Sequence, residues 1–184
     1  HRALTEIGAN VQIVHLERLA AGRIVPHARV LIAPLVIQDA PHFQEVISSY
    51  VEQGGNLIAG PYFLTYLQDT YVSPQVPPIP AQDLFGSKRQ ALSYPKEPEL
   101  SFIFDGVSTI ASPVKGHHVL ETYTILRSDT RPLAQSAEGI CGTARESGKG
   151  SALRIGTMAG CSYGSTSNRG LASWLISVLV KAGC

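Results

Sequence analysis

Residues 28–60 read ARVLIAPLVIQDAPHFQEVISSYVEQGGNLIAG, and their pattern sets the architecture of the chain. The first six, ARVLIA, are almost all apolar, which is typical of a strand covered on both faces in a parallel α/β sheet. Apolar residues then recur every three or four positions, as on a helix with one buried face, at Phe43, Val46, Ile47, Tyr50 and Val51. We expect Asp39 to cap this helix and the glycine pair at 54–55 to end it. Because residues 56–60 (NLIAG) are typical of a second short buried strand, the whole segment predicts a βαβ unit.

The segments outside this unit extend the α/β pattern in both directions. Residues 1–9 (HRALTEIGA) have the pattern of a helix that ends at Gly8, and residues 11–14 (VQIV) that of a short strand. Further strands are expected at residues 101–104, 118–125, 139–144 and 151–157. The last two flank the charged glycine turn RESGKG, which predicts a late antiparallel hairpin.

A second amphipathic helix closes the chain. Its apolar face consists of Leu171, Trp174, Leu175, Val178 and Leu179. Ser167 or Asn168 is its expected cap. Together the elements predict an α/β fold of three layers, with a mainly parallel, flavodoxin-like sheet and the late antiparallel hairpin.

A proline-rich segment interrupts the pattern. Six of the 12 prolines lie in residues 71–98, which we expect to form an extended surface excursion with a short turn at residues 83–86. A boundary between two domains is the alternative, but it would leave two small cores of roughly 70 and 86 residues. We therefore expect one domain over residues 1–184.

Charge and hydropathy exclude several classes of protein. The chain is 44% hydrophobic and 16% charged, and its 15 basic and 14 acidic residues give a net charge of +1. This balance, without blocks of one sign, does not favour a nucleic-acid or membrane partner. The longest apolar run, Val30–Ile37, has eight residues, whereas a membrane-spanning helix needs about 20. No signal peptide is recognisable, and the start at His1 suggests a piece of a larger protein.

The three cysteines are odd in number and widely spaced: Cys141, Cys161 and Cys184. They form no C-x-x-C pair, so the sequence indicates neither a disulfide framework nor a zinc site. We expect a reducing compartment, the cytoplasm, and no cofactor.

The turn where an α/β hydrolase would hold its nucleophile has no nucleophilic residue. Residues 59–63 read AGPYF, without Ser or Cys at the bend, and Pro61 removes a backbone donor from any oxyanion hole. We therefore predict no catalytic residue there. Elsewhere, Cys161 in the segment GCSYG is an alternative nucleophile with His117 or His118 as its base, or simply a small residue in a connection.

The His117–His118 pair is a weak candidate for a metal site. Adjacent residues on a strand point to opposite faces, so the two rings would not bind one ion. Glu121, three residues beyond His118, would also face the other way on a strand. We predict no metal.

Aromatic residues cluster after the strand at 56–60, where open α/β sheets bind their ligands. These residues are Tyr62, Phe63, Tyr66 and Tyr71. They are candidates for stacking on a sugar substrate or for anchoring a protein interface. Alternatively, Tyr62 and Tyr66 are four apart and lie on one face of a packed helix.

Several stretches resemble the second domain of glycoside hydrolase family forty-two β-galactosidases. Residues 28–60, ending in YVEQGGNLIAG, resemble its strand–helix–strand unit, and residues 147–157 (SGKGSALRIGT) resemble its late hairpin. The opening LTEIGANVQIV resembles its entry, and the helix from Asn168 its closing helix. The resemblance covers nearly the whole chain, with the first strand of the family domain falling before His1.

This resemblance implies a fold similar to class I glutamine amidotransferases without their catalytic Cys–His pair, and a role in trimerisation. The implied partners are further copies of the chain and a catalytic (β/α)₈ barrel in the same polypeptide, which carries both catalytic carboxylates. After the strand that ends at Gly60, the family has a polar loop that approaches a neighbouring active site, where this chain has PYFLTYL. The resulting hypothesis is a non-catalytic assembly domain of a β-galactosidase-like glycoside hydrolase in carbohydrate metabolism. The alternatives are a stand-alone hydrolase or amidotransferase relative using Cys161, and a carbohydrate-binding module.

Overall fold

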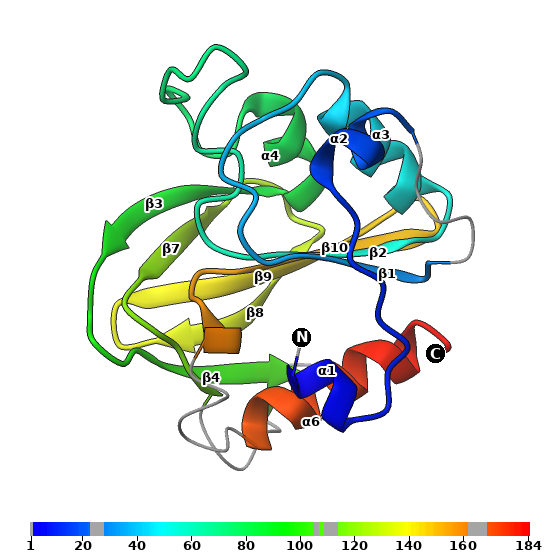
Figure 1. Ribbon diagram of the computed structural model, residues 1–184. Helices are drawn as coiled ribbons and strands as arrows, with labels where there is room; N and C mark the ends of the chain where they lie inside the picture. Colours follow the sequence, from blue (N-terminus) through cyan, green and yellow to red (C-terminus); the bar gives the residue numbers. More distant parts are fainter. Residues whose placement is uncertain (1, 23–27, 105–106, 109–113, 162–168) are drawn as a thin grey trace.

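The computed structural model describes residues 2–22, 28–104, 107–108, 114–161 and 169–184 (Figure 1). Its helices are α1 (Arg2–Glu6), α2 (Leu16–Ala20), α3 (Phe43–Glu52), α4 (Ile79–Phe85) and α6 (Arg169–Lys181). Its strands are β1 (Val30–Ala33), β2 (Asn56–Ala59), β3 (Ser87–Ser93), β4 (Glu99–Phe104), β5 (Val107–Ser108), β6 (Val114–Lys115), β7 (Leu120–Ile125), β8 (Thr130–Ser136), β9 (Gly139–Ser147) and β10 (Gly150–Ile155).

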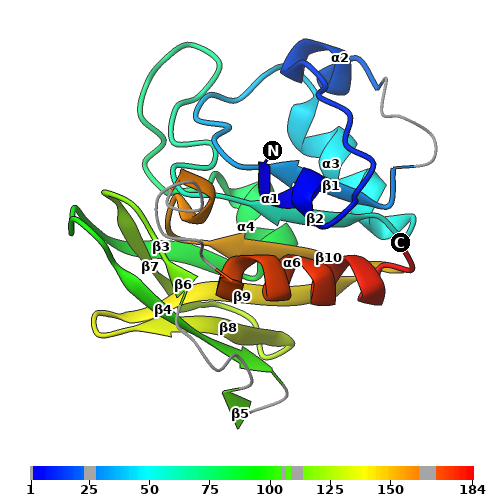
Figure 2. The same ribbon diagram turned by 60° about the horizontal axis from the view of Figure 1, so that its bottom comes forward.

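Helices cover both faces of the central sheet, in three layers as predicted (Figures 1 and 2). Helices α2, α3 and α4 lie on one face, where Phe43, Ile47 and Val51 of α3 join a buried apolar cluster. Helices α1 and α6 lie on the other, where Trp174 of α6 packs against Phe102 of β4 with 5.1 Å between ring centroids. Each amphipathic helix thus buries its apolar stripe against the sheet.

The predicted strand–helix–strand unit is confirmed. Strand β1 pairs with β2 in parallel, with α3 between them in sequence. The expected helix cap is wrong, because α3 begins at Phe43 and its N-cap residue is His42, without a side-chain capping bond. Asp39 instead accepts a hydrogen bond from the backbone N–H of Ala40, at 2.9 Å.

The sheet is mixed, with the strand order β1-β2-β10-β9-β8-β4-β5 and β6 also paired with β4. Strands β1, β2 and β10 are parallel, whereas the pairs β10–β9, β9–β8, β8–β4, β4–β5 and β4–β6 are antiparallel. The late hairpin is confirmed by β9 and β10, with Gly148 in its turn at φ 61°. The antiparallel part continues through β8 and β4, so it is larger than the one hairpin that the sequence predicts.

Residues 71–98 contain more regular structure than the predicted surface excursion. Helix α4 buries Ala81, Leu84 and Phe85 in the same cluster as α3, and β3 pairs with β7 in a separate two-stranded sheet. The turn expected at 83–86 is the end of α4, where Gly86 takes a left-handed φ of 61°. Part of this segment therefore belongs to the core.

The ends of the chain follow the sequence pattern in part. Helix α1 and the left-handed Gly8 after it are confirmed, as is α6, whereas the expected caps Ser167 and Asn168 lie outside the described residues. Residues 11–14 do not form a strand. A strand needs a neighbour to take its backbone hydrogen bonds, and in the described part of the chain these residues have none.

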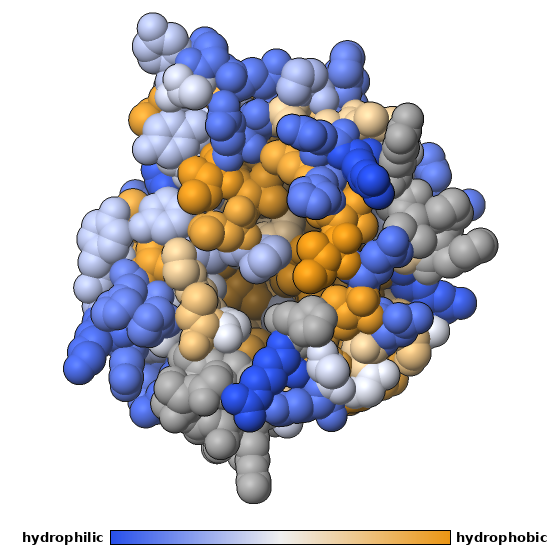
Figure 3. Space-filling model, viewed as in Figure 1, coloured by the Kyte–Doolittle hydropathy of each residue, from blue (hydrophilic) through white to orange (hydrophobic). Residues whose placement is uncertain are grey.

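Strand β1 has β2 on one side and no described strand on the other. Its first three side chains are therefore only half-buried, as are Leu4 of α1 and Leu16 of α2. Figure 3 shows an apolar area over these elements. Among the described helices, none combines the length and the apolar composition that crossing a lipid bilayer requires.

Candidate functional site

The parallel strands β2 and β10 end side by side, with Ala59 of β2 in register with Arg154 of β10. Open α/β sheets bind their ligands at the carboxyl ends of such strands. After β2 the chain turns through Gly60 and Pro61 to Tyr62, and after β10 it passes through Gly156. The candidate site is built from these turns and from side chains of β3 and β7.

Two glycines let backbone segments meet at this edge. A Cβ on Gly60 would lie 2.1 Å from the carbonyl oxygen of Pro34, and a Cβ on Gly156 would lie 2.1 Å from that of Glu121. The backbone N–H of Glu121 also donates to the Gly156 carbonyl oxygen, at 2.7 Å. Contact with Gly156 therefore fixes where Glu121 enters the site.

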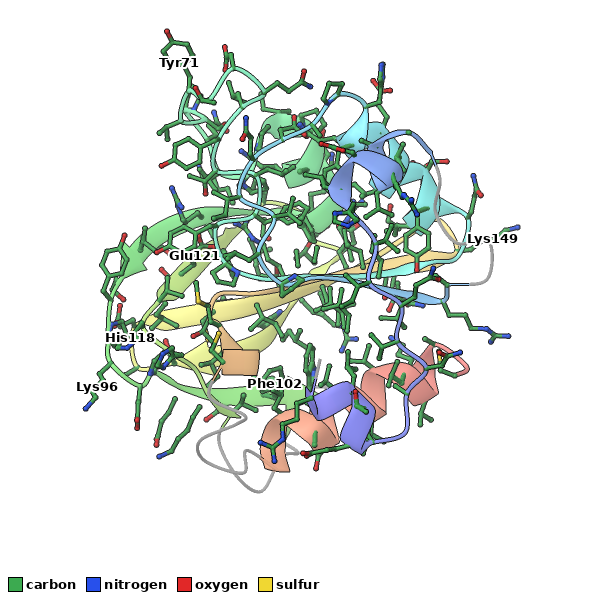
Figure 4. The ribbon with its side chains drawn as sticks, in the orientation of Figure 1. Tyr71, Lys96, Phe102, His118, Glu121 and Lys149 are labelled. Atoms are coloured by element: carbon green, nitrogen blue, oxygen red, sulfur yellow. The ribbon has the colours of Figure 1, made fainter. Side chains whose placement is uncertain are left out.

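The carboxylate of Glu121 is the centre of a buried polar network. Glu121, which Figure 4 labels, has no exposed surface, and its carboxylate accepts four hydrogen bonds. Its Oε1 accepts from the backbone N–H of Tyr62 at 3.0 Å and from Arg89 at 3.2 Å. Its Oε2 accepts from the Tyr123 hydroxyl at 3.0 Å and from Arg154 at 3.2 Å. A carboxylate with this many donors is held in one orientation.

Arg154 is also fully buried, and aromatic rings flank its guanidinium. Its Cζ lies 4.4 Å from the ring centroid of Tyr123 and 6.0 Å from that of Phe85. Cation–π attraction thus adds to the ion pair with Glu121. Burial raises the pKa of Tyr123 well above its ordinary value, the Arg154 cation opposes this rise and the Glu121 charge adds to it, so the phenol stays a hydrogen-bond donor.

Tyr62 joins the site through its backbone N–H. Its backbone has a left-handed φ of 59°, a conformation that is strained in residues with a side chain. Burial, with a smaller contribution from Tyr94, which follows β3, raises the pKa of its hydroxyl to about 12. The side chain of Tyr62 is half-buried.

At this edge the charged side chains pair with one another. The two ionisable groups deepest in the site, Glu121 and Arg154, neutralise each other, and the turn at 59–63 carries no Ser or Cys. These contacts hold the turn that follows β2 in place. The proton-transfer and nucleophile geometry of an α/β hydrolase has no counterpart at this turn.

The predicted aromatic residues do not all reach the surface. Phe63 is fully buried between Phe43 and Phe85, with ring centroids 6.2 and 5.4 Å away. Tyr66 and Tyr71 are 39% and 73% exposed, and Figure 4 shows Tyr71 at the outer end of its loop, away from Glu121. Residues 61–64 form turns, so the alternative of a packed helix face is not the one adopted.

The expectation for the histidine pair is wrong in its geometry. His118 lies before β7 at a left-handed φ of 51°, so the strand rule does not apply to it. The rings of His117 and His118 lie side by side, with 4.0 Å between centroids. In the described ranges, no three His, Cys, Asp or Glu side chains gather as ligands for a metal ion.

All three cysteines are free thiols. Cys161 is exposed, whereas Cys141 is buried in β9 as expected for a packing residue. Burial raises the pKa of the Cys141 thiol to about 12, although a hydrogen bond with Ser136 opposes the shift. Cys141 is therefore a protonated, unreactive thiol at neutral pH.

Sequence reasoning missed most of the network. It considered Glu121 only beside His118 and did not consider Arg89, Tyr94 or Arg154. A signal was present at Arg154, because a charged residue within the apolar run of a buried strand needs a buried partner.

The described fold occurs in parts of large glycosidases. No family model matches the chain, and no curated protein matches its sequence. Among solved structures, the β-galactosidase from Rahnella sp. R3 matches with a TM-score of 0.70 at 18% identity, over 85% of this chain and 23% of its own. Gan42B, a GH42 β-galactosidase from G. stearothermophilus, matches with a TM-score of 0.68 at 15% identity, over 85% of this chain and 22% of its own.

A third match comes from an enzyme of another specificity. The exo-β-1,4-mannosidase Op5Man5 from an Opitutaceae bacterium has a TM-score of 0.64 at 14% identity, over 96% of this chain and 29% of its own. The chain thus spans less than a third of each of these enzymes. At such identities the likeness shows a shared fold.

Proposed function

We propose that this chain is a non-catalytic assembly domain of a β-galactosidase-like glycoside hydrolase. It folds like a class I glutamine amidotransferase, associates as a trimer and lies beside a catalytic barrel of the same polypeptide. The aromatic residues at its carboxyl edge, Tyr62, Tyr66 and Tyr71, contact a neighbouring subunit and help to shape its active site. Its compartment is the cytoplasm, where three free thiols remain reduced.

The internal pairing of the charged groups at the carboxyl edge is the observation that carries this proposal. A catalytic α/β domain keeps that edge open for its substrate. Here Glu121 and Arg154 form an ion pair at that edge, and Glu121 also accepts a hydrogen bond from the backbone N–H of Tyr62. A domain whose charged groups are engaged in this way can serve its polypeptide through its surface, and exposed tyrosines are typical anchors of protein interfaces.

The likeness to solved enzymes supports the same conclusion. Two of the reported structures are β-galactosidases and one is a mannosidase, and each matches the chain with less than a third of its own length. We place catalysis in the part of such an enzyme that this chain does not match.

Four measurements test this proposal. An immunoblot of source-cell lysate should show a band several times heavier than 19.7 kDa. Light scattering of that natural polypeptide should give the mass of a trimer. The chain alone should cleave no nitrophenyl galactoside or mannoside. The double variant Tyr62→Ala, Tyr66→Ala should weaken assembly or sugar affinity of the natural polypeptide, and unchanged values for both would remove the role of these tyrosines.

The alternative is a stand-alone hydrolase or amidotransferase relative that uses Cys161. The exposure of this thiol is the observation in its favour. It predicts a band near 19.7 kDa, rapid alkylation of Cys161 and loss of activity in Cys161→Ser. A carbohydrate-binding module, the other alternative, would instead bind β-galactosides tightly in a titration of the isolated chain.

A further inference from the structure

One side of strand β1 has backbone groups without a strand to bond to. In a parallel pair, alternate residues of a strand bond to the neighbouring strand. The carbonyl oxygen of Ala33 accepts from the N–H of Gly60, directly after β2, at 2.9 Å, so Ala33 and Leu31 face β2. The N–H and C=O groups of Val30 and Ile32 therefore point to the other side, where no strand of the described chain pairs with β1.

Apolar side chains flank this free side on both faces of the sheet. They are half-buried, and each group packs against one of the two buried clusters. Leu4, Ile7, Val30 and Ile32 pack against the cluster that contains Trp174 of α6, whereas Val14, Leu16 and Leu31 pack against the cluster that contains Phe43 of α3. Figure 3 shows apolar residues gathered around a hollow on this side of the molecule. A strand covered on both faces is apolar along its whole length, so this edge matches a strand of that kind.

The described chain does not itself supply a strand for this place. Residues 11–14 read VQIV, a sequence typical of a strand, but they carry the chain from α1 on one face to α2 on the other without pairing with β1 (Figures 1 and 2). A helix would leave the N–H and C=O groups of β1 unpaired, because its own backbone groups are already bonded to each other. An extended backbone offers donors and acceptors at the spacing of β1.

We propose that the free side of β1 takes one further apolar strand, parallel to β1, from the part of the same polypeptide that lies outside residues 1–184. This inference rests on the proposed function, under which the chain belongs to a longer polypeptide. Addition of a strand to an open sheet edge is a recurring mode of recognition, in which backbone hydrogen bonds give affinity and pockets for alternate side chains give specificity. The parallel direction follows from β1, β2 and β10, which are parallel and have helices on both faces.

A second copy of the chain matches this edge less well than a single strand does. In a two-fold dimer the copies would pair through β1 itself, which is four residues long. The chain between α1 and α2 also passes in front of β1 in Figure 1, so one strand has better access than the sheet of a second domain. The reported enzymes match this chain with less than a third of their own length, so a polypeptide of that size has further segments to supply the strand.

The first arm of the experiment measures hydrogen exchange in residues 1–184 alone and in the natural polypeptide. The Val30 and Ile32 amides point to the free side of β1, whereas the Ile58 amide lies in β2, which has a strand on each side. We expect the Val30 and Ile32 amides to exchange at least about tenfold more slowly in the natural polypeptide. The rate at Ile58, the control amide, should change less.

The second arm tests whether the apolar side chains become covered. Val30→Cys places a thiol on half-buried β1, and Gln53→Cys, at the exposed end of α3, is the matched control, both in a background that carries Cys161→Ser and Cys184→Ser. A thiol reagent should modify position 30 at least about tenfold more slowly in the natural polypeptide than in residues 1–184 alone, and position 53 at similar rates in both. A helix over the same hollow would slow labelling at position 30 without giving the β1 amides an acceptor, so slow labelling with unchanged exchange overturns the strand.

The remaining outcomes separate the two proposals. An immunoblot band near 19.7 kDa contradicts the proposed function itself. A heavier polypeptide in which the Val30 and Ile32 amides exchange as fast as in residues 1–184 alone contradicts the added strand and leaves the proposed function intact. Slow exchange of these amides in residues 1–184 alone also overturns the proposal, and its loss on dilution would identify a second copy as the occupant. Should residues 1–184 not fold alone, these amides must exchange as slowly as that of Ile58 in the natural polypeptide, and faster exchange overturns the proposal.

Discussion

The guanidinium of Arg154 and the carboxylate of Glu121 form an ion pair with 3.2 Å between Nη2 and Oε2, and neither side chain has exposed surface. The two residues are 33 positions apart and lie on strands of different sheets. Water cannot replace either partner at this depth. The pair therefore makes the folded state depend on both groups together.

Replacing Glu121 should cost more stability than replacing Arg154. Glu121→Ala leaves Arg154 buried without a counter-ion and frees the Tyr62 N–H, so we expect a loss of about 3–5 kcal/mol in the free energy of unfolding. In Arg154→Met, Glu121 keeps Arg89 and two further donors, so the loss should be smaller. Urea denaturation of the isolated chain measures both values. The reverse order would mean that the Tyr62 and Arg89 contacts contribute little.

Gly156 should not tolerate a side chain. Its Cβ would meet the carbonyl oxygen of Glu121 at 2.1 Å and the carbonyl carbon at 3.0 Å, and backbone atoms cannot rotate away as side chains do. We expect Gly156→Ala to destabilise the fold by about 1–3 kcal/mol or more. Gly160→Ala is the control, because nothing lies within 4 Å of its Cβ. Equal thermal unfolding of both variants would argue against the close approach of β7 to β10.

The spacing of apolar residues along the chain predicts those helices and strands that bury one continuous apolar surface. The apolar stripe of α3, the consecutive apolar residues of β2 and the face of α6 each bury a periodic surface, and each was located within a few residues. The glycine turn between β9 and β10 likewise has local chemistry that favours one conformation. These elements needed no knowledge of distant segments.

Strand β8 and helix α4 both contain prolines, and neither element is among those predicted from the sequence, where the prolines of residues 71–98 indicated an irregular excursion. Pro132 lies in β8 between two paired strands, where a register shift between Pro132 and Ala134 accommodates the missing donor. Pro80 lies in the first turn of α4, where the missing N–H has no intrahelical partner to lose. In both cases the position of the proline within the strand or helix, rather than the proline content of the segment, determines whether regular structure can form.

The candidate site depended on contacts that no local pattern contains. Glu121 meets Tyr62 across 59 residues and Arg89 across 32. A buried arginine in β10 signals that a carboxylate is needed, but the chain has 14 acidic residues and spacing alone does not choose among them. Within the predicted aromatic cluster, only the fold separates buried Phe63 from exposed Tyr71.

The three thiols should fall into two classes that differ in their rate of reaction with a thiol reagent. Cys161 and Cys184 are exposed, whereas Cys141 is buried, and burial raises its pKa to about 12. A disulfide reagent at neutral pH should therefore modify two thiols rapidly and the third only after denaturation. Mass spectrometry of the labelled peptides identifies which thiols have reacted. Rapid labelling of Cys141 in the native protein would show that β9 opens readily to solvent.

Stability should fall at alkaline pH, and Tyr50 should contribute to the fall. Burial raises its pKa from 10.0 to about 12, and its hydroxyl donates to the Ala28 carbonyl oxygen at 3.1 Å. The unfolded chain then loses this proton more easily than the folded one. The stabilisation is complete below pH 10 and is lost as the pH rises toward 12.

Tyr50→Phe isolates this contribution, because phenylalanine keeps the ring and does not titrate. Lysines and other tyrosines also titrate in this range, so the informative quantity is the difference between wild type and variant at each pH. We expect Tyr50→Phe to be less stable than wild type below pH 10, through the lost hydrogen bond, and the difference to shrink or reverse toward pH 12. Urea unfolding across this range measures the difference. A constant difference would mean that the Tyr50 hydroxyl titrates alike in the folded and unfolded chains.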